Sequence, residues 1–394
     1  MTYVTIGRGG DAVQMLALAD AVRSRGHDVS LIGAHPVAPY AFDTVDGRVR
    51  SLIRRLPWWV RDSLEWGFGL QAMRRAVSAG RQGVDVIIHR ASVYDAGAAG
   101  LARRLRVPLV LYLDTHVEVE RAFRGEGYWR GRHARAMNVL GRAADVIATP
   151  SRAVADYYIG LGLPAGRIEI VRNGISERYL RMGLEAADIH PPLADAAPYT
   201  LGFVGNLSQW HGVDLLLDAL RDLRNEPHPG GQPRLVIVGR GTEDEVLKAR
   251  ARALGVASAI EWRGAVSHDE AVRAIGEFDI AVLPSTLPTG APMKLAEYAA
   301  MARPIIAPDY PNIRDLFTDK EEIVLVAPGN VRALTQAVQT LVADPVMARR
   351  IGRAAQRRVA GYTWEQAVEQ LLRGVSRSTH ATPSPAGTSR GSEE

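Results

Sequence analysis

Lys294 and Glu297 lie three residues apart near the start of an expected helix, and they suit the binding of a charged, hydroxyl-rich ligand. Gly290 and Pro292 precede them and mark where the helix should begin, with the proline at its first position. The free amides of a first helical turn bind anions, and the helix dipole strengthens that binding. Lys294 adds a cation for a diphosphate, and Glu297 can accept hydrogen bonds from two hydroxyl groups. The pair therefore suits a nucleotide sugar; the alternative interpretation is an exposed ion pair.

The elements that must position this pair alternate between strand and helix, which predicts an α/β fold with parallel sheets. Short apolar runs are the expected strands: Tyr3–Ile6, Val29–Ile32, Val84–Ile88, Pro108–Leu113, Asp145–Ala148, Ile168–Val171, Tyr199–Val204, Leu235–Val238, Ile260–Trp262, Asp279–Leu283, Ile305–Ala307 and Ile323–Val326. Helices of roughly 10–15 residues separate most of them, such as Asp11–Arg25 and Gly212–Leu223. We expect two facing Rossmann-like domains, with ligands bound in an interdomain cleft at the carboxyl ends of the strands.

The expected domain boundaries follow from where the pattern stops and restarts. Residues 1–175 form the N-terminal domain and residues 199–375 the C-terminal domain, whose last helix could pack back on the first. Residues 176–198 mix polar side chains with the pair Pro191-Pro192 and are expected to be the linker. Residues 376–394 are rich in Ser, Thr, Pro and Gly, which predicts a disordered tail.

The composition excludes several classes of function. A chain of 394 residues without cysteine has no disulfide, no thiolate metal site and no cysteine nucleophile. This fits a reducing cytoplasm, where we expect the protein to be located. The start of the chain lacks the features of a signal peptide, and no apolar run reaches the ~18 residues that a membrane helix needs. The net charge of +5 could suit an anionic donor or an anionic membrane.

Further motifs follow the strands in a defined order. Gly9-Gly10 lies between the first strand and the first helix, where glycine lets the backbone approach a phosphate; it is not G-x-G-x-x-G, which counts against a dinucleotide cofactor. The later motifs are Ile87-Ile88-His89-Arg90, Leu113-Asp114-Thr115-His116, Val171-Arg172-Asn173-Gly174-Ile175, the run from Phe203 to Gly212, Val238-Gly239-Arg240-Gly241 and the helix of Lys294 and Glu297.

Together these motifs resemble the retaining glycosyltransferases of family 4, glycosyl transferases group 1, which have the GT-B fold. The resemblance runs from about Thr2 to Leu372 and is strongest in the second half. It implies an N-terminal acceptor-binding domain and a C-terminal domain that binds a nucleotide-diphosphate sugar, most often a UDP-sugar. It also implies transfer of a hexosyl or pentosyl group to a hydroxyl acceptor, with no essential metal and no other cofactor.

Site residues are carried over from the family by position. Glu297 would bind the ribose, Lys294 the diphosphate, and His116 would lie near the transferred sugar, so His116 and Lys294 are the expected catalytic residues. Arg90 and Asp114 are expected to bind the acceptor. The full expected donor set is Gly9, Gly10, Asn206, His211, Arg240, Ala265, Val266, Thr289, Gly290, Ala291, Lys294 and Glu297.

Two departures from the family pattern affect the donor site. Thr289 stands where many members have the first glutamate of E-x7-E, which leaves the donor sugar open. Asn206 and His211 stand where many members have arginine and lysine. Lys294 can supply the missing charge, and Arg240 is an alternative cation or, equally, a solvated loop residue.

Structural roles remain open for several of these residues. His116 could be a hydrogen-bonded loop histidine, and Arg90 could simply pair with Asp95 or Asp114. The segment Arg48–Arg61 carries five arginines and two tryptophans. It could touch a membrane or the acceptor, or it could be a helix with a solvated basic face and buried tryptophans.

The functional alternatives also stay open at this point. A small natural-product or aminocyclitol acceptor fits the missing membrane anchor, and a lipid-linked or polysaccharide acceptor is the alternative. Two further alternatives are a sugar-nucleotide epimerase of the same architecture and a non-catalytic nucleotide-sugar-binding subunit. No nucleic-acid partner is expected, membrane association is not favoured, and the oligomeric state is not readable from the sequence.

Overall fold

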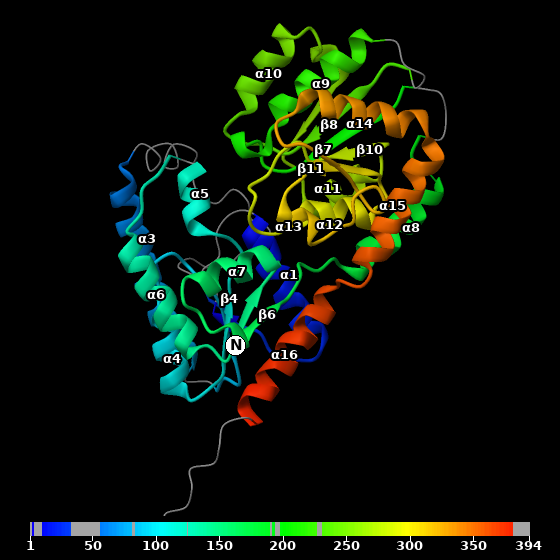
Figure 1. Ribbon diagram of the computed structural model, residues 1–394. Helices are drawn as coiled ribbons and strands as arrows, with labels where there is room; N and C mark the ends of the chain where they lie inside the picture. The colour runs from blue at the N-terminus through cyan, green and yellow to red at the C-terminus, as the bar shows by residue number, and fades with distance from the viewer. Residues whose placement is uncertain are drawn as a thin grey trace, which may run out of the picture.

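The structure, a computed structural model, describes residues 2–3, 10–32, 56–80, 83–123, 125–189, 191–193, 198–226 and 231–380. Two parallel sheets with helices packed against them form the two halves of the molecule (Figure 1). The α/β prediction is therefore confirmed, and each expected strand has a counterpart in the described part of the chain.

The N-terminal half contains two sets of paired strands. β1 (Thr2–Tyr3) pairs with β2 (Leu31–Ile32), and a four-stranded sheet has the order β3-β4-β5-β6. Its strands are β3 (Ile87–Arg90), β4 (Leu109–Tyr112), β5 (Val146–Thr149) and β6 (Ile168–Ile170). The helices of this half are α1 (Gly10–Ser24), α3 (Trp58–Gly80), α4 (Gly97–Leu105), α5 (Val117–Phe123), α6 (Arg130–Ala143), α7 (Arg152–Gly160) and the short η1 (Ala165–Arg167).

Alternation along β4 explains how helices cover both faces of this sheet. Leu109 and Leu111 belong to the apolar cluster that contains residues of α4 and α6. Val110 and Tyr112 point to the opposite face and join a second cluster with Met15 of α1. A strand that is buried on both faces therefore reads as a continuous apolar run.

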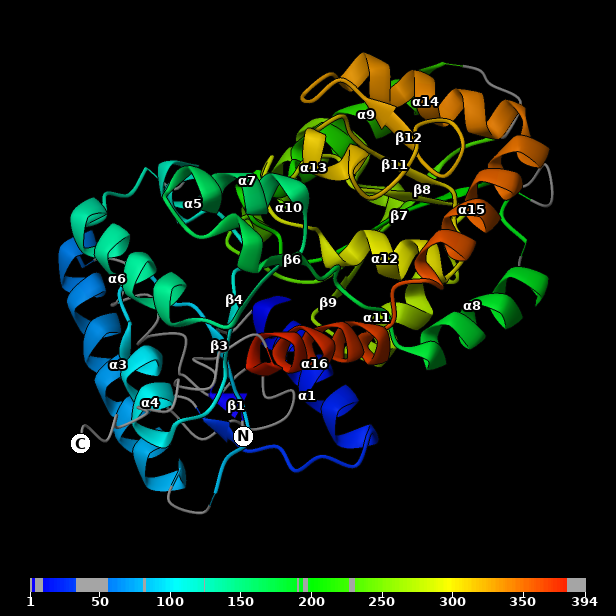
Figure 2. The same ribbon diagram turned by 60° about the horizontal axis from the view of Figure 1, so that its bottom comes forward.

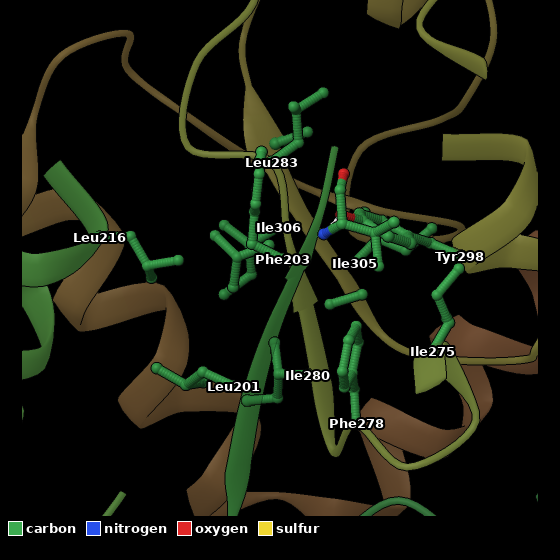
Figure 3. Packing of buried hydrophobic residues seen from close by; sticks show 14 of the residues in the cluster. Leu201, Phe203, Leu216, Ile275, Phe278, Ile280, Leu283, Tyr298, Ile305 and Ile306 are labelled. Atoms are coloured by element: carbon green, nitrogen blue, oxygen red, sulfur yellow. Dashed lines mark hydrogen bonds between the residues drawn. The ribbon is translucent and has the colours of Figure 1, made fainter. Parts of the chain in front are cut away.

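The C-terminal half is a six-stranded sheet with the order β12-β11-β10-β7-β8-β9. Its elements are β7 (Thr200–Val204), η2 (Gln209–His211), α9 (Val213–Asn225), β8 (Arg234–Val238), α10 (Asp244–Ala253), η3 (Ala257–Ala259), β9 (Ile260–Gly264), α11 (His268–Ile275), β10 (Ile280–Val282), α12 (Met293–Ala300), β11 (Ile305–Pro308), α13 (Pro311–Arg314), β12 (Val324–Val326), α14 (Val331–Ala343) and α15 (Pro345–Val359). Leu201, Phe203 and Ile280 lie among the buried side chains of this sheet (Figure 3).

The strand order places the candidate site at the middle of this sheet. Read from β7, the order is that of the doubly wound nucleotide-binding fold, and the winding reverses between β7 and β10. Ligands bind such sheets at the carboxyl ends of the strands beside that reversal. The loops after β7 and β10, which lead to His211 and Lys294, therefore lie at the expected position.

The chain crosses between the halves twice, and the two crossings lie side by side. Ile175 and Thr363 form a parallel bridge, and the amide of Ile175 donates to the carbonyl of Tyr362 at 2.8 Å. Gly174 is required here, since a Cβ on it would lie 2.4 Å from the amide nitrogen of Trp364. After the second crossing, α16 (Trp364–His380) packs beside α1 on the N-terminal half (Figure 2).

The predicted linker and tail both contain more helix than expected. The predicted linker, residues 176–198, contains α8 (Glu177–Ile189), which packs on α12. Gly183 permits this contact, because a Cβ there would lie 1.8 Å from the carbonyl oxygen of Ala300. Residues 376–380, predicted to be tail, belong to α16, and residues 381–394 lie outside the described part of the chain.

Among the described helices, none combines the length and the apolar character that a membrane-spanning helix needs.

Candidate functional site

Lys294 lies in the first turn of α12, with its ammonium nitrogen 5.0 Å from the ring centre of Phe203. Gly205 makes room for it: a Cβ on Gly205 would lie 2.7 Å from Nζ. Within the described residues, Nζ forms no hydrogen bond and no ion pair. Burial lowers the pKa of Lys294 to about 7, although the charge of Glu297 acts in the opposite direction. The site thus holds a cation that lacks a counter-ion.

The start of α12 also has free amides. The helix begins at Met293, so Pro292 is its N-cap and not its first residue, as the sequence had suggested. Four amides, those of Gly290, Ala291, Met293 and Lys294, have no acceptor among the described residues. Free amides at a helix start are the donors that bind phosphate groups.

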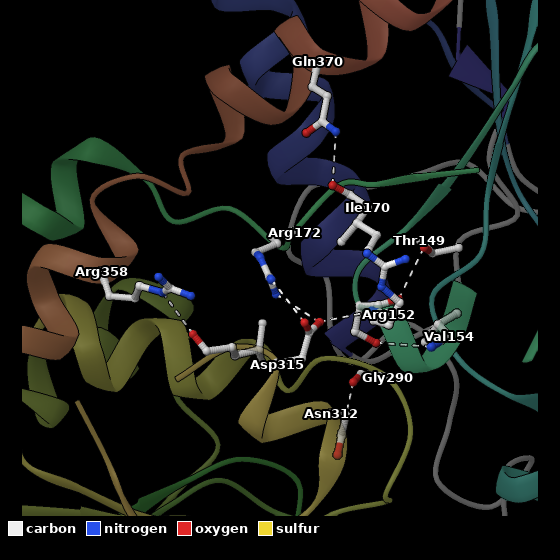
Figure 4. A network of polar contacts seen from close by, with 12 residues as sticks. Thr149, Arg152, Val154, Ile170, Arg172, Gly290, Asn312, Asp315, Arg358 and Gln370 are labelled. Atoms are coloured by element: carbon white, nitrogen blue, oxygen red, sulfur yellow. Dashed lines mark hydrogen bonds and ion pairs between the residues drawn. The ribbon is translucent and has the colours of Figure 1, made fainter. Parts of the chain in front are cut away.

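Two asparagines hold the carbonyl groups of the loop before α12. The Asn312 amide donates to the carbonyl of Gly290 at 3.0 Å (Figure 4), and the Asn173 amide donates to the carbonyl of Ala291 at 2.8 Å. The C=O and N–H groups of a trans peptide point in opposite directions. The bond from Asn312 therefore turns the amide of Ala291 away from α13. The bond from Asn173 connects the N-terminal half to the same loop.

His211 lies beside Lys294, at the position where many family members carry lysine. Its Nδ1 lies 2.5 Å from the carbonyl oxygen of Asn206, and its ring packs at 5.8 Å from Phe203. Burial and the charge of Lys294 lower the pKa of His211 to about 3. His211 is therefore neutral at pH 7 and does not replace the missing cation, which leaves Lys294 to supply it.

Arg240, Ala265 and Val266 lie together at the carboxyl ends of β8 and β9. Arg240 is exposed, and its guanidinium Nε lies 3.3 Å from where a Cβ of Gly264 would be. Val266 packs against the core of the C-terminal half, whereas Ala265 is exposed. The structure thus places Arg240 beside Gly264, next to the expected donor-binding residues Ala265 and Val266.

Glu297 lies one turn after Lys294 but does not pair with it. Its Oε1 lies 2.7 Å from Nε2 of His268, the first residue of α11. The side chains are 12% and 19% exposed for Glu297 and His268, so this pair is largely shielded from water. The interpretation of Lys294 and Glu297 as an exposed ion pair is therefore wrong.

Thr289 has an unsatisfied polar atom next to the same loop. Its hydroxyl oxygen is buried and has no hydrogen-bond partner in the part of the chain that the structure describes. Buried hydroxyl groups are normally hydrogen-bonded, so an unpaired one beside a binding loop is available to a ligand.

The N-terminal half brings its predicted residues to the ends of β3 and β4. Arg90 donates from Nε and Nη2 to Oδ2 of Asp114, at 3.0 and 2.8 Å. The structural alternative for Arg90 is thus correct as to its partner. The backbone oxygen of Asp114 lies 3.2 Å from where a Cβ of Gly290 would be, so the two halves meet at the loop before α12.

His116 is buried next to α7. Its Nε2 lies 3.1 Å from the carbonyl oxygen of Ala153, which can only accept, and its ring stacks on Tyr157 at 4.1 Å. Burial lowers the pKa of His116, so the ring is neutral and its Nδ1 is an acceptor. The structural alternative, a hydrogen-bonded loop histidine, is therefore correct for Nε2, whereas Nδ1 remains available to a ligand. Gly10 begins α1, and Gly9 lies outside the described residues.

A chain of hydrogen-bonded side chains connects this half to the loop before α12. Gln14 of α1 donates to the hydroxyl oxygen of Tyr112 at 3.0 Å and to Oδ1 of Asn173 at 2.5 Å. Asn173 in turn holds the carbonyl of Ala291. Farther along the boundary, Asp315 accepts hydrogen bonds from the amide of Arg152 and from the side chain of Arg172 (Figure 4).

Comparison with known proteins decides which family this site belongs to. Residues 8–178 match the sequence model described as Glycosyltransferase Family 4, and residues 198–344 match that of Glycosyl transferases group 1. The chain belongs to the family 4 glycosyltransferases. This glycosyltransferase is an enzyme that uses a nucleotide-sugar donor, and its fold is GT-B.

Two curated relatives and one solved structure illustrate the similarity. The glycosyltransferase is 28% identical to a glycogen synthase of Mycobacterium tuberculosis, over 92% of this chain and 90% of that protein. It is 27% identical to an alpha-D-kanosaminyltransferase of Streptomyces kanamyceticus, over 79% and 81% of the two chains. Its fold is similar to that of HepE of Anabaena in complex with UDP, with a TM-score of 0.71, 18% identity and coverage of 95% and 99%.

Several residues of this glycosyltransferase site were not predicted as such. His268, Asn312 and Gln14 act through contacts between elements that are distant in sequence, so local patterns carry no signal for them. Asn173 lies in a motif that the sequence singles out, but its contact with Ala291 is visible only in the structure.

The first two tryptophans of the glycosyltransferase's α3 differ in exposure. Trp58 is half-buried and packs edge-on against Trp129 at 5.9 Å, whereas Trp59 is 54% exposed. The alternative in which both are buried is therefore wrong for Trp59 and only partly correct for Trp58. Arg61 pairs with Glu126 at 2.7 Å, and Arg48–Arg55 lie outside the described residues.

Proposed function

We propose that this enzyme transfers a sugar from a UDP-sugar to a hydroxyl acceptor with retention of configuration. The observation that carries the proposal is Lys294, a shielded cation without a counter-ion at a helix start with free amides. Glu297 lies one turn away, which suits a ribose joined to a diphosphate. HepE, whose fold is similar, was solved in complex with UDP and with UDP-glucose, which supports UDP as the nucleotide.

The proposed reaction breaks the bond between the anomeric carbon and the β-phosphate oxygen. Both electrons of that bond stay on the phosphate oxygen, and positive charge spreads over the anomeric carbon and the ring oxygen. Lys294 and the amides of Gly290, Ala291 and Met293 stabilise the negative charge on the leaving diphosphate.

The acceptor then attacks the anomeric carbon from the face that the phosphate leaves. Its hydroxyl oxygen forms the new bond, and its proton passes to the departing phosphate oxygen, so atoms and charge balance. The same face is used for both events, which retains the configuration. No side chain forms a covalent bond to the sugar in this sequence of steps.

His116 is proposed to bind the transferred sugar. Because Nε2 is engaged by Ala153, Nδ1 is the nitrogen that can accept a hydrogen bond from a sugar hydroxyl. Thr289, whose hydroxyl is buried and unpaired, is the proposed second contact. A metal-free reaction is part of the same proposal, since Lys294 provides the charge that a bound cation would otherwise supply.

We propose a small polyhydroxylated acceptor, such as a natural-product core or an aminocyclitol. Such a molecule offers several hydroxyl groups to charged side chains, and the alpha-D-kanosaminyltransferase, which is similar over most of both chains, is named for the transfer of a small sugar. Arg90 and Asp114, paired at the ends of β3 and β4, are the proposed acceptor contacts. The alternative is an acceptor on a polysaccharide or a lipid. It is supported by the similarity to a glycogen synthase and to a phosphatidyl-myo-inositol mannosyltransferase.

The test combines donor and acceptor screening by mass spectrometry. UDP-sugars are incubated with candidate acceptors, and a product heavier by one glycosyl residue is expected with a wild-type enzyme. Lys294→Met should abolish that product while the protein stays folded, which a thermal melt checks. Product formation at the wild-type rate by Lys294→Met would contradict the proposal, and the anomeric proton coupling of the product in NMR decides retention.

A further inference from the structure

His268 lies where three helices meet, and it contacts the carboxylate proposed to bind ribose. Its Nε2 is 2.7 Å from Oε1 of Glu297 on α12, and its Nδ1 is 3.3 Å from the hydroxyl oxygen of Tyr179 on α8. The Tyr179 ring packs edge-on against the imidazole at 5.3 Å. Both nitrogens of the ring are therefore engaged, and the ring plane is held from the side.

The hydrogen-bond directions around His268 require a proton on each nitrogen. The Tyr179 hydroxyl has one proton, which it donates to Oδ1 of Asp269 at 2.6 Å, because a carboxylate can only accept. The tyrosine oxygen is then left to accept from Nδ1. Glu297 likewise accepts from Nε2, so the arrangement describes an imidazolium with two donors.

The surrounding charges favour that state. Burial lowers the pKa of His268, but the hydrogen bond and charge of Glu297 and the charge of Asp269 outweigh it, so the pKa is raised. Arg178 of α8 pairs with Asp269 at 2.9 Å, and the charge of Arg273 on α11 also acts on Asp269. A carboxylate beside an imidazolium stays ionised and keeps one orientation.

This contact leaves one carboxylate oxygen of Glu297 open. Oε1 faces His268, whereas Oε2 has no hydrogen-bond partner among the described residues. A carboxylate that is fixed through one oxygen presents the other in a defined direction, which is the requirement for reading two adjacent hydroxyl groups.

We propose that His268 is a positioning residue that orients the Glu297 carboxylate toward the ribose hydroxyls of the donor nucleotide. This inference rests on the proposed function and deepens it, since it adds a residue that acts through Glu297. It also gives a role to the packing of α8 on α12, because α8 positions Tyr179, whose hydroxyl oxygen contacts Nδ1 of His268.

The experiment measures the dissociation constants of UDP and of 2′,3′-dideoxy-UDP by calorimetry. The ratio of the two constants reports ribose recognition alone, because the dideoxy nucleotide keeps the base and the diphosphate. Wild type should prefer UDP by about tenfold or more, the scale of a charge-assisted hydrogen bond. His268→Ala should reduce that preference to about twofold while affinity for the dideoxy nucleotide stays unchanged.

Two amide variants separate positioning from simple loss of volume. His268→Gln can place an amide donor near the position of Nε2 and should restore most of the preference for UDP. His268→Asn reaches only as far as Nδ1 and should behave like His268→Ala. His27→Ala, an exposed histidine after α1, is the matched control and should change neither constant.

The outcomes distinguish this inference from the proposed function. A full preference for UDP in His268→Ala, or equal weakening of both nucleotides, would overturn the role of His268. If wild type itself showed no preference, or if Glu297→Gln kept it, the ribose site would be wrong and the proposal would fall with it. Thermal melts of all variants confirm that each is folded at the temperature of the titration.

Discussion

Binding of a UDP-sugar should draw a proton from solution onto Lys294. In the free enzyme the pKa of Lys294 is lowered to about 7, so roughly half of these side chains are charged at pH 7 and about one tenth at pH 8. A bound diphosphate supplies the missing counter-ion and raises this pKa toward its ordinary value of about 10.4. Uptake should therefore be about half a proton at pH 7 and about nine tenths at pH 8.

The same linkage predicts how affinity varies with pH. Above pH 7, each further unit should weaken donor binding by up to about tenfold, since about 1.4 kcal/mol is needed per unit to protonate the lysine. Below pH 6 the lysine is already charged in the free enzyme, so this dependence should vanish. His211 does not contribute, because its pKa is lowered to about 3.

Calorimetry in buffers of different ionisation enthalpy measures this uptake directly. The slope of the observed binding enthalpy against the buffer's ionisation enthalpy gives the number of protons bound. A UDP-sugar serves as the ligand, because its diphosphate diester does not titrate between pH 6 and 9. A slope near zero at pH 8, or an equal slope in Lys294→Met, would refute the assignment of an unpaired cation at this position.

Three further predictions concern space, packing and metal. Gly205 has φ +150°, and Gly205→Ala would place a Cβ 2.7 Å from Nζ of Lys294. The turnover number should therefore fall about tenfold or more in steady-state kinetics, while a thermal melt shows that the protein remains folded. Gly183→Ala would meet the Ala300 carbonyl at 1.8 Å and should lower the free energy of unfolding by about 1–3 kcal/mol, whereas Gly131→Ala, with open space around it, should not; chemical denaturation compares the two. Activity should persist in EDTA, and its loss with full rescue by Mg²⁺ or Mn²⁺ would contradict the proposed role of Lys294.

The strands and the position of α12 could be predicted because their signals are local. A strand that is buried on both faces of a sheet, such as β4 with Leu111, appears in the sequence as a short continuous apolar run. This signal does not depend on residues distant in the sequence. The alternative that Arg90 pairs with Asp95 or Asp114 is correct for Asp114, because the ends of adjacent parallel strands meet at one edge of a sheet. The acceptor-binding role predicted for both residues stays a prediction. α8 was missed because Pro191-Pro192 and the polar residues before it resemble a linker.

The charge state of the site could not be read from the sequence. His211 is neutral because burial and the nearby charge of Lys294 lower its pKa, and Glu297 is paired with His268 because α11 packs beside α12. Both facts depend on tertiary contacts that bring together residues tens of positions apart. The sequence therefore indicates which groups are present, but only the packing decides which of them carries an unpaired charge.

Placing Lys294 without a counter-ion costs stability in the free enzyme, since its charged form is disfavoured by burial. Asn312 and Asn173 impose a related constraint, because they hold two carbonyls of the loop before α12 and leave its amides unpaired. In the proposed reaction, a donor diphosphate would bind Lys294 and these amides, and its negative charge would grow as the bond to the sugar breaks. Under that proposal, groups that lack partners in the free enzyme would stabilise the transition state most strongly. Because Asn173 and Gln14 belong to the N-terminal half, the contact at the Ala291 carbonyl forms only when both halves meet at the loop.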